Sequence, residues 1–113
     1  MPFRSAEKHL RDILASILHI EAFIADLQFK NYQHDEKTKA AVDRKLQIIT
    51  EAVIRLELDD PAAFPDIDWQ GYRGMGNFLR HSYHRVSDEI VWNTVKDDLP
   101  VLKRIVEKAL TPS

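Results

Sequence analysis

The chain has 113 residues, and a hydrophobic content of 44% suffices for one compact core, so we expect a single domain over residues 1–113. A formal net charge of −2 excludes a protein that coats nucleic acid through overall positive charge, and any RNA contact therefore needs a local basic patch. The absence of cysteine excludes disulfides, thiolate metal sites and cysteine nucleophiles. No apolar run approaches the roughly 18 residues of a membrane span, so we expect a soluble, cytoplasmic protein that does not contact membranes.

The first predicted helix begins at Ser5, a suitable N-cap residue, and carries apolar residues at alternating spacings of three and four. Leu14, Leu18 and Phe23 are expected to widen this stripe, as a bundle helix requires. The residues of the stripe are Leu10, Ile13, Ile17, Ile20, Ile24 and Leu27.

A polar break over residues 30–35 separates this helix from a second one with the same periodicity. The two helices are predicted to pack as an antiparallel pair. Residues 58–66 contain two prolines and are predicted to form a loop. The apolar stripe of the second helix consists of Val42, Leu46, Ile49, Val53 and Leu56.

A third helix is expected to begin with Asp68 as N-cap and to continue to about Arg85. Ser87 then caps a shorter fourth segment, and Pro100 suits the first turn of a last helix. No segment alternates with the period of two that a strand requires. The sequence therefore predicts an all-α, up-and-down bundle of four to five helices.

All three glycines of the chain lie close together in the third predicted helix, at Gly71, Gly74 and Gly76. Each costs roughly 1 kcal/mol relative to alanine inside a helix, so the cluster indicates that backbone must come close to something. Close packing against another helix is the favoured interpretation, and close approach of a ligand is the alternative.

The same helix is unusual in charge, because residues 69–86 contain no Asp or Glu although the chain has 18 acidic residues. At about 100° per residue, four polar residues fall within about 60° of one another, and His81 lies about 40° beyond Asn77. Arg85 adds a further cation. The four residues on the shared face are Arg73, Asn77, Arg80 and His84.

Two interpretations of this face stay open. It is either a solvated basic surface, paired with acids of the second helix such as Glu51 or Asp43, or a site for an anionic ligand such as phosphate. A histidine can move a proton on a ribose or phosphate oxygen, and a neighbouring arginine can stabilise charge at phosphorus. RNA supplies its own 2′-hydroxyl nucleophile, so this chemistry needs no cofactor and no metal. A metal site at His81 and His84 is the weaker alternative, because no carboxylate of the window completes it.

The stretch from Gly76 to Tyr83 resembles the signature R-x4-H-x-Y of the HepT-like branch of the HEPN superfamily. Asn77 corresponds to the polar residue that often follows the arginine, His81 to the histidine and Tyr83 to the tyrosine. The resemblance covers nearly the whole chain. Its other parts are Ile48 to Ala52, Trp69, Val91-Trp92 and Asp98 to Pro100.

The resemblance implies a homodimeric ribonuclease toxin in which the motifs of both chains face one cleft. It also implies a partner, a minimal nucleotidyltransferase antitoxin that transfers AMP onto the motif tyrosine, Tyr83. His81 is then the acid or base, with Asn77 beside it, and the phosphate is bound by cations of the same helix. These cations are Arg73, Arg80, His84 and Arg85.

One position departs from the family pattern, because Gly76 stands where the family places its catalytic arginine. Arg73, Arg80 or an arginine delivered across a dimer interface are the candidate replacements. The leading hypothesis is therefore a ribonuclease toxin, and the second is a catalytically weak subunit that docks a nucleotidyltransferase and presents RNA or nucleotide to it. A purely structural bundle is the third.

Overall fold

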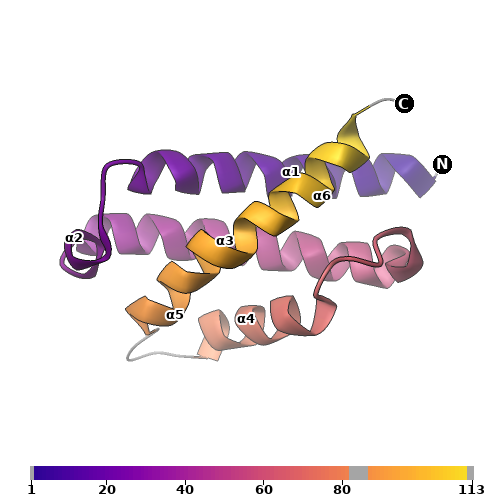
Figure 1. The fold of residues 1–113 in the computed structure, drawn as a ribbon. Coiled ribbons are helices and arrows are strands. Elements are labelled where there is room, and N and C mark those ends of the chain that lie inside the picture. Colours follow the sequence, from indigo (N-terminus) through magenta and orange to yellow (C-terminus); the bar gives the residue numbers. More distant parts are fainter. Residues whose placement is uncertain (1, 82–86, 112–113) are drawn as a thin grey trace.

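The computed structural model describes residues 2–81 and 87–111 and shows an all-helical bundle (Figure 1). Two long helices, α1 (Pro2–Ile24) and α3 (Glu36–Asp59), lie side by side and run in opposite directions. The apolar stripes predicted for them form the centre of the core, where Ile13, Ile17, Ile20, Val42 and Leu46 have no exposed surface. The predictions of an all-α, up-and-down bundle and of an antiparallel first pair are confirmed.

Three details of the first helix differ from the prediction. Helix α1 begins at Pro2, so Ser5 lies within the helix and is not its N-cap. Proline is well suited to the first turn, where its missing N–H costs no hydrogen bond. Leu18 and Phe23 were expected to widen the buried stripe, but 46% and 39% of their surfaces are exposed.

The polar break predicted over residues 30–35 contains a short helix, α2 (Phe29–Gln33). It forms because Tyr32 is buried, with its ring centroid 5.1 Å from that of Trp92. The side chain of Asn31 accepts a hydrogen bond from the backbone N–H of Gln28, 3.2 Å away, which closes the turn. Asp35 then caps α3 by accepting a hydrogen bond from the backbone N–H of Thr38.

The loop predicted after α3 contains one short 3-10 turn, η1 (Pro61–Ala63), and leads to α4 (Trp69–His81). Asp68 caps α4 as predicted, since its carboxylate accepts a hydrogen bond from the backbone N–H of Gly71 at 3.0 Å. The expected continuation of this helix to Arg85 lies outside the described residues. Helix α4 runs along α3 on the side away from α1 (Figure 1).

The last two predicted segments are joined into one rod that crosses α1 and α3 (Figure 1). Ser87 caps α5 (Asp88–Asn93) as predicted, and the π-helical turn η2 (Thr94–Asp98) connects it to α6 (Leu99–Leu110). Pro100 lies in the first turn of α6, as expected. Because proline has no N–H to donate, the helical hydrogen bonding is interrupted here, and the wide π turn lets the chain continue in one direction.

Within the described part of the chain, no helix is both long and apolar enough to cross a membrane.

Candidate functional site

Helix α4 packs on α3, and its buried residues are Tyr72, Gly76 and Leu79. A Cβ atom at Gly76 would lie 3.3 Å from the side chain of Thr50, closer than most real contacts of that atom. Glycine therefore lets the two helices approach each other here. The predicted role of the glycine cluster in close helix packing is confirmed at this position.

The other two glycines have different surroundings. A Cβ atom at Gly71 would collide with the carboxylate of Asp68, so glycine at this position preserves the cap of α4. A Cβ atom at Gly74 would have no neighbour within 4 Å, and the residue is exposed. Packing within the chain thus gives no reason for glycine at position 74, and the alternative of a close approach by a ligand or partner stays open there.

The polar residues predicted to share one face of α4 are exposed along its outer side. We call the described members of this group, Arg73, Asn77, Arg80 and His81, the motif face. Asn77 and His81 continue an exposed line that starts at Gln70 and passes Gly74. Three of the predicted site residues, Tyr83, His84 and Arg85, lie outside the described residues.

The side chain of Arg80 turns back along the helix toward Gly76. Its Nη1 atom lies 3.4 Å from the place where a Cβ atom at Gly76 would be. This direction is the usual one for a long helical side chain, which leans over the preceding turn. The guanidinium of Arg80 therefore occupies the space next to the position at which the family pattern has its arginine.

Arg73 is in a different electrostatic situation, because its guanidinium forms an ion pair with Glu57 of α3. The hydrogen bond to Glu57 raises the pKa of Arg73 above its usual value. The expectation that acids of the second long helix pair with this face is thus correct in kind, but the acid is Glu57 and not Glu51 or Asp43. Half of the Arg73 side chain stays exposed. Its charge is already compensated within the chain.

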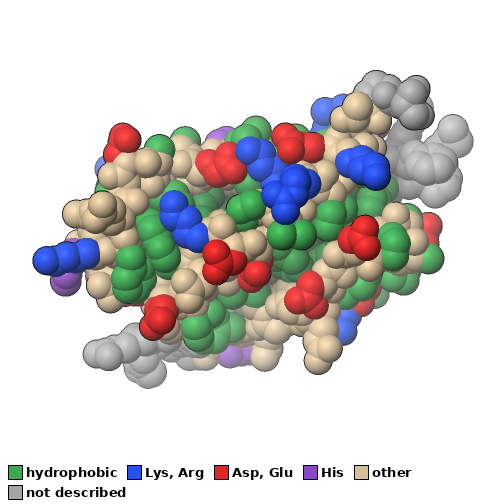
Figure 2. All heavy atoms as spheres, viewed as in Figure 1, with side chains coloured by type: hydrophobic (Ala, Val, Ile, Leu, Met, Phe, Trp, Pro, Cys, Tyr) green, Lys and Arg blue, Asp and Glu red, His purple; other side chains and the backbone are tan. Residues whose placement is uncertain are grey.

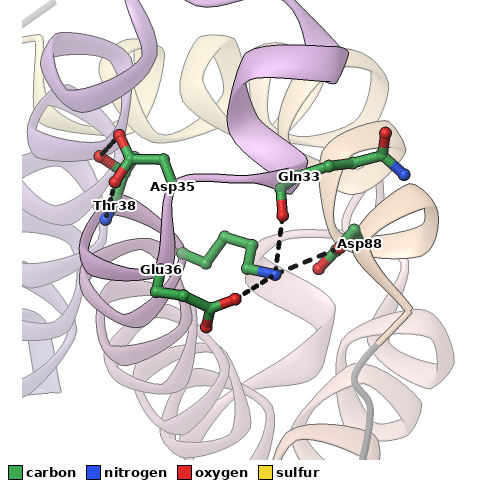
Figure 3. Close-up of polar contacts among 6 residues, drawn as sticks. Gln33, Asp35, Glu36, Thr38 and Asp88 are labelled. Carbon is green, nitrogen blue, oxygen red and sulfur yellow. Dashed lines mark hydrogen bonds and ion pairs between the residues drawn. The ribbon is translucent and has the colours of Figure 1, made fainter.

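A second polar cluster lies where α2, α3 and α5 meet, and we call its residues Gln33, Glu36, Lys39, Asp43 and Asp88 the junction. Figure 3 shows the lysine of this cluster among Gln33, Glu36 and Asp88. The ammonium group of Lys39 donates hydrogen bonds to the backbone carbonyl of Gln33 at 3.1 Å and to Asp88 Oδ2 at 3.3 Å. It also lies 3.2 Å from Glu36 Oε1. Partial desolvation opposes the charge of Lys39, but the bonds to Glu36 and Asp88 leave its pKa raised.

The junction holds the beginning of α5, the next described helix after α4. Asp88 is the first residue of α5, directly after the Ser87 cap. Lys39 therefore connects the start of α5 to α3 across 49 residues of sequence. This contact could not be predicted from periodicity or a motif, because its two partners lie far apart along the chain.

Asp43 is the most perturbed carboxyl group of the junction. Burial, together with the nearby charge of Asp88, raises the pKa of Asp43 to about 6, and the charge of Lys39 only partly offsets these effects. Its neighbour Tyr32 has a raised pKa for the same reasons, since it is buried and faces the carboxylates of Asp43 and Asp88. The junction is therefore a place where the fold tolerates unfavourable charge.

Among residues 2–81 and 87–111, no group of three or more His, Asp or Glu side chains is arranged to hold a metal ion. The motif face offers one imidazole, one amide and two guanidinium groups, with the guanidinium of Arg80 free of any ion pair to a described acid. Groups of these types can bind a phosphodiester and move a proton on it.

The comparisons with known proteins identify the family of the chain. The family model described as "Ribonuclease HepT-like" matches residues 13–109, a range that contains both the motif and the junction. The chain belongs to the HepT-like ribonuclease family. Family membership places it among enzymes that act on RNA, and it confirms the resemblance found in the sequence.

Several relatives of similar length support the assignment. A protein of Thermococcus cleftensis named "Probable ribonuclease HepT" is 38% identical over 105 residues, which cover 93% of this chain and 96% of the relative. Two proteins of Methanocaldococcus jannaschii, each named "Putative RNase", are both 32% identical. The matches cover 95% of this chain in each case, and 92% and 98% of the relatives. No solved structure matches the chain significantly.

Proposed function

We propose that this HepT-like chain is the toxin of a toxin–antitoxin module and that it cleaves RNA without a metal ion. The 2′-hydroxyl of RNA attacks the adjacent phosphorus, the 5′-oxygen leaves, and a 2′,3′-cyclic phosphate forms. His81 takes the proton from the hydroxyl or returns one to the leaving oxygen. Arg80 stabilises the negative charge that develops on the phosphate oxygens. Asn77 orients the same phosphate, while His84 and Arg85 add positive charge along its path.

The observation that carries this proposal is the position of the Arg80 guanidinium, 3.4 Å from the Cβ position of Gly76. It offers a charged group at the place where the family pattern has its arginine, without a competing acid. Arg73 is the less suitable candidate, because Glu57 already holds its guanidinium. Arg73 then contributes to RNA affinity through its exposed half.

The proposal is tested by RNA cleavage in the presence of EDTA, with His81→Ala as the variant. We expect a loss of about 10²-fold or more, the usual contribution of acid–base catalysis. His34→Ala is the matched control, since His34 is also exposed but follows α2, away from the motif face. Equal cleavage by wild type and His81→Ala would remove His81 from the mechanism. Complete inhibition of the wild type by EDTA would contradict the metal-free reaction.

We also propose that the antitoxin is a minimal nucleotidyltransferase that transfers AMP onto Tyr83. The added phosphate would be held by the cations that otherwise hold RNA, so the modification would inhibit through charge and occlusion without changing the fold. Coexpression with such an enzyme, followed by peptide mass spectrometry, should show AMP on the peptide that contains Tyr83. Tyr83→Phe should lose it. A neutralised complex with unmodified Tyr83 would leave steric masking as the better account.

A homodimer with both motif faces in one cleft is the assembly that we propose. Its support is the exposed line of Gln70, Gly74, Asn77 and His81, where Gly74 would allow another backbone to come close. Light scattering of the purified chain at micromolar concentration should give the mass of a dimer. A monomer would contradict a shared cleft.

The second candidate function is a catalytically weak subunit that binds a nucleotidyltransferase and presents RNA or nucleotide to it. The observation in its favour is Gly76 in place of the family's arginine. Under this hypothesis the chain copurifies with the transferase but fails to cleave RNA, and Arg80→Ala changes only RNA affinity.

A further inference from the structure

A cavity of about 160 Å³ lies between α4 and α6, apart from the motif face. Its floor is apolar and includes Met75, Val101 and Ile105, and 46% of the Val101 surface is exposed. Three carboxylates stand around it, at Asp66, Asp68 and Asp98. Figure 2 shows acidic side chains with apolar surface between them where the first part of α6 approaches α4.

These three carboxylates have no ion-pair partner among the described residues. Asp68 accepts the capping hydrogen bond from Gly71 with one oxygen, which leaves its other oxygen available. Burial raises the pKa of Asp98, and the charges of Asp97 and Asp68 raise it further. The fold thus holds negative charge beside apolar lining residues, and no described residue forms a salt bridge with any of the three carboxylates.

Tyr72 gives a second, independent indication that the cavity receives a ligand. Only 7% of this residue is exposed, and no described residue forms a hydrogen bond with its hydroxyl. Among the described residues, every side-chain oxygen or nitrogen atom that is fully shielded from solvent has a hydrogen-bond partner. Because the Tyr72 hydroxyl has no such partner, it is not fully shielded and must reach open space. The cavity is the open space that Tyr72 lines, and the ring is held there by the surrounding core. A buried tyrosine normally directs its hydroxyl to a partner.

We propose that this cavity receives the side chain of an arginine that a partner protein presents. The methylene groups of the arginine would lie on Val101 and Ile105, and its guanidinium would donate to the carboxylates of Asp66 and Asp98 and to the Tyr72 hydroxyl. The carboxylates of the described residues are not arranged to hold a metal ion, and a planar, delocalised cation satisfies several separated acceptors better than a point charge does. Nucleic acid is disfavoured, because its phosphates would face three carboxylates.

The location of the cavity separates this docking site from the catalytic one. Met75 lines the cavity, and Asn77 belongs to the motif face. These two residues are two positions apart in the helix, so their side chains point in directions that differ by about 200° around the axis of α4. A protein anchored at the cavity would leave the motif face accessible. The partner is therefore one that holds the ribonuclease while RNA or a modifying enzyme still reaches His81.

The test uses the full chain, labelled with ¹⁵N and titrated with N-acetyl-arginine amide, while amide shifts are followed by NMR. We expect saturable shifts at Gly71, Tyr72 and Val101. The citrulline analogue, which has the same shape without the charge, should bind about tenfold more weakly. Asp98→Asn should weaken arginine binding by a similar factor. Asp26→Asn is the matched control, an equal change of charge at an exposed acid in the turn after α1, and should leave binding unchanged.

Asp66→Asn provides a second variant in the segment before α4, where the side chain is exposed and its loss does not threaten the fold. It should weaken binding as Asp98→Asn does. Equal binding of arginine and citrulline, or no saturable shift at the cavity, would overturn the proposal. Tighter binding of spermidine at the same amides would also overturn it, because the occupant would then be a free polyamine. None of these outcomes depends on RNA cleavage, so the docking site and the proposed function can fail separately.

Discussion

The motif face of α4 and the junction of α2, α3 and α5 both carry cationic side chains, but the surroundings of these side chains differ. At the junction, the Lys39 side chain is 18% exposed and has two acids and a carbonyl around it. On the motif face, Arg80 and His81 are exposed and face no acid of their own helix. Pairing and partial burial make the junction a structural element, whereas the unpaired, accessible guanidinium of Arg80 remains available to a substrate phosphate.

If the paired charges of the junction stabilise the fold, removing the ammonium group of Lys39 should destabilise the protein. Lys39→Met should lower the free energy of unfolding by about 1–2 kcal/mol, because it removes three polar contacts and leaves Asp43 and Asp88 facing each other without a cation. Urea unfolding measures this change. Lys37→Met is the matched control, since Lys37 is an exposed lysine of the same helix. Similar losses in both variants would refute a special role for Lys39.

Removing the charge of Asp43 should stabilise the fold, in contrast to removing that of Lys39, because the pKa of Asp43 is raised. A carboxyl group with a folded-state pKa of about 6 destabilises the fold when it is charged, so its penalty is present above pH 6 and disappears as the pH falls toward 4. Asp43→Asn should therefore stabilise the protein by about 1 kcal/mol at pH 7.5, a value reduced for the partial exposure of the side chain. The difference from wild type should vanish near pH 4. A destabilised Asp43→Asn variant at pH 7.5 would contradict this account of the junction.

Replacing Gly74 or Gly76, which lie on opposite sides of α4, is expected to change the stability of the fold by the smallest amount. Gly74→Ala should stabilise the fold by about 0.5–1 kcal/mol, because a Cβ atom there has open space and alanine favours the helix. Gly76→Ala should gain less or lose stability, since its Cβ atom would press on Thr50. If Gly74 lies where RNA or a second copy approaches, Gly74→Ala will cleave RNA more slowly despite its higher stability. Thermal unfolding and cleavage rates of the two variants decide this.

The apolar residues of α1 and α3 recur with the period of a helix, and their spacing predicted the core because the buried side of a helix repeats with the same period. Ile13, Ile17, Leu46 and Ile49, all predicted from spacing, have no exposed surface. It failed for α2, whose five residues form a helix only because Tyr32 packs on Trp92, a residue 60 positions away. Such contacts between distant segments leave no local pattern in the sequence.

The sequence predicted which residues of α4 form the candidate site, but it did not predict which of them form ion pairs within the chain. The acid-free window and the motif gave Asn77, Arg80 and His81, and these lie on the exposed side of α4. The sequence left both Arg73 and Arg80 as candidate substitutes for the missing arginine, with Arg80 favoured by its place beside the motif histidine and Arg73 by the helix face that it shares with Asn77. Only the packing of α4 on α3 separates them, because it brings Glu57 to one and directs the other toward Gly76. The proposed roles of both residues remain predictions.

The central claim is that Arg80 takes over the task of the arginine that Gly76 replaces, and single-turnover cleavage of one RNA by Arg80→Ala and Arg73→Ala tests it most directly. We predict that Arg80→Ala slows cleavage by about 10²-fold, as the loss of a donor to transition-state charge does, and that Arg80→Lys recovers part of the rate. Arg73→Ala should keep the cleavage rate of bound RNA and weaken only RNA binding. An Arg73→Ala rate as low as that of Arg80→Ala, or lower, would contradict the claim.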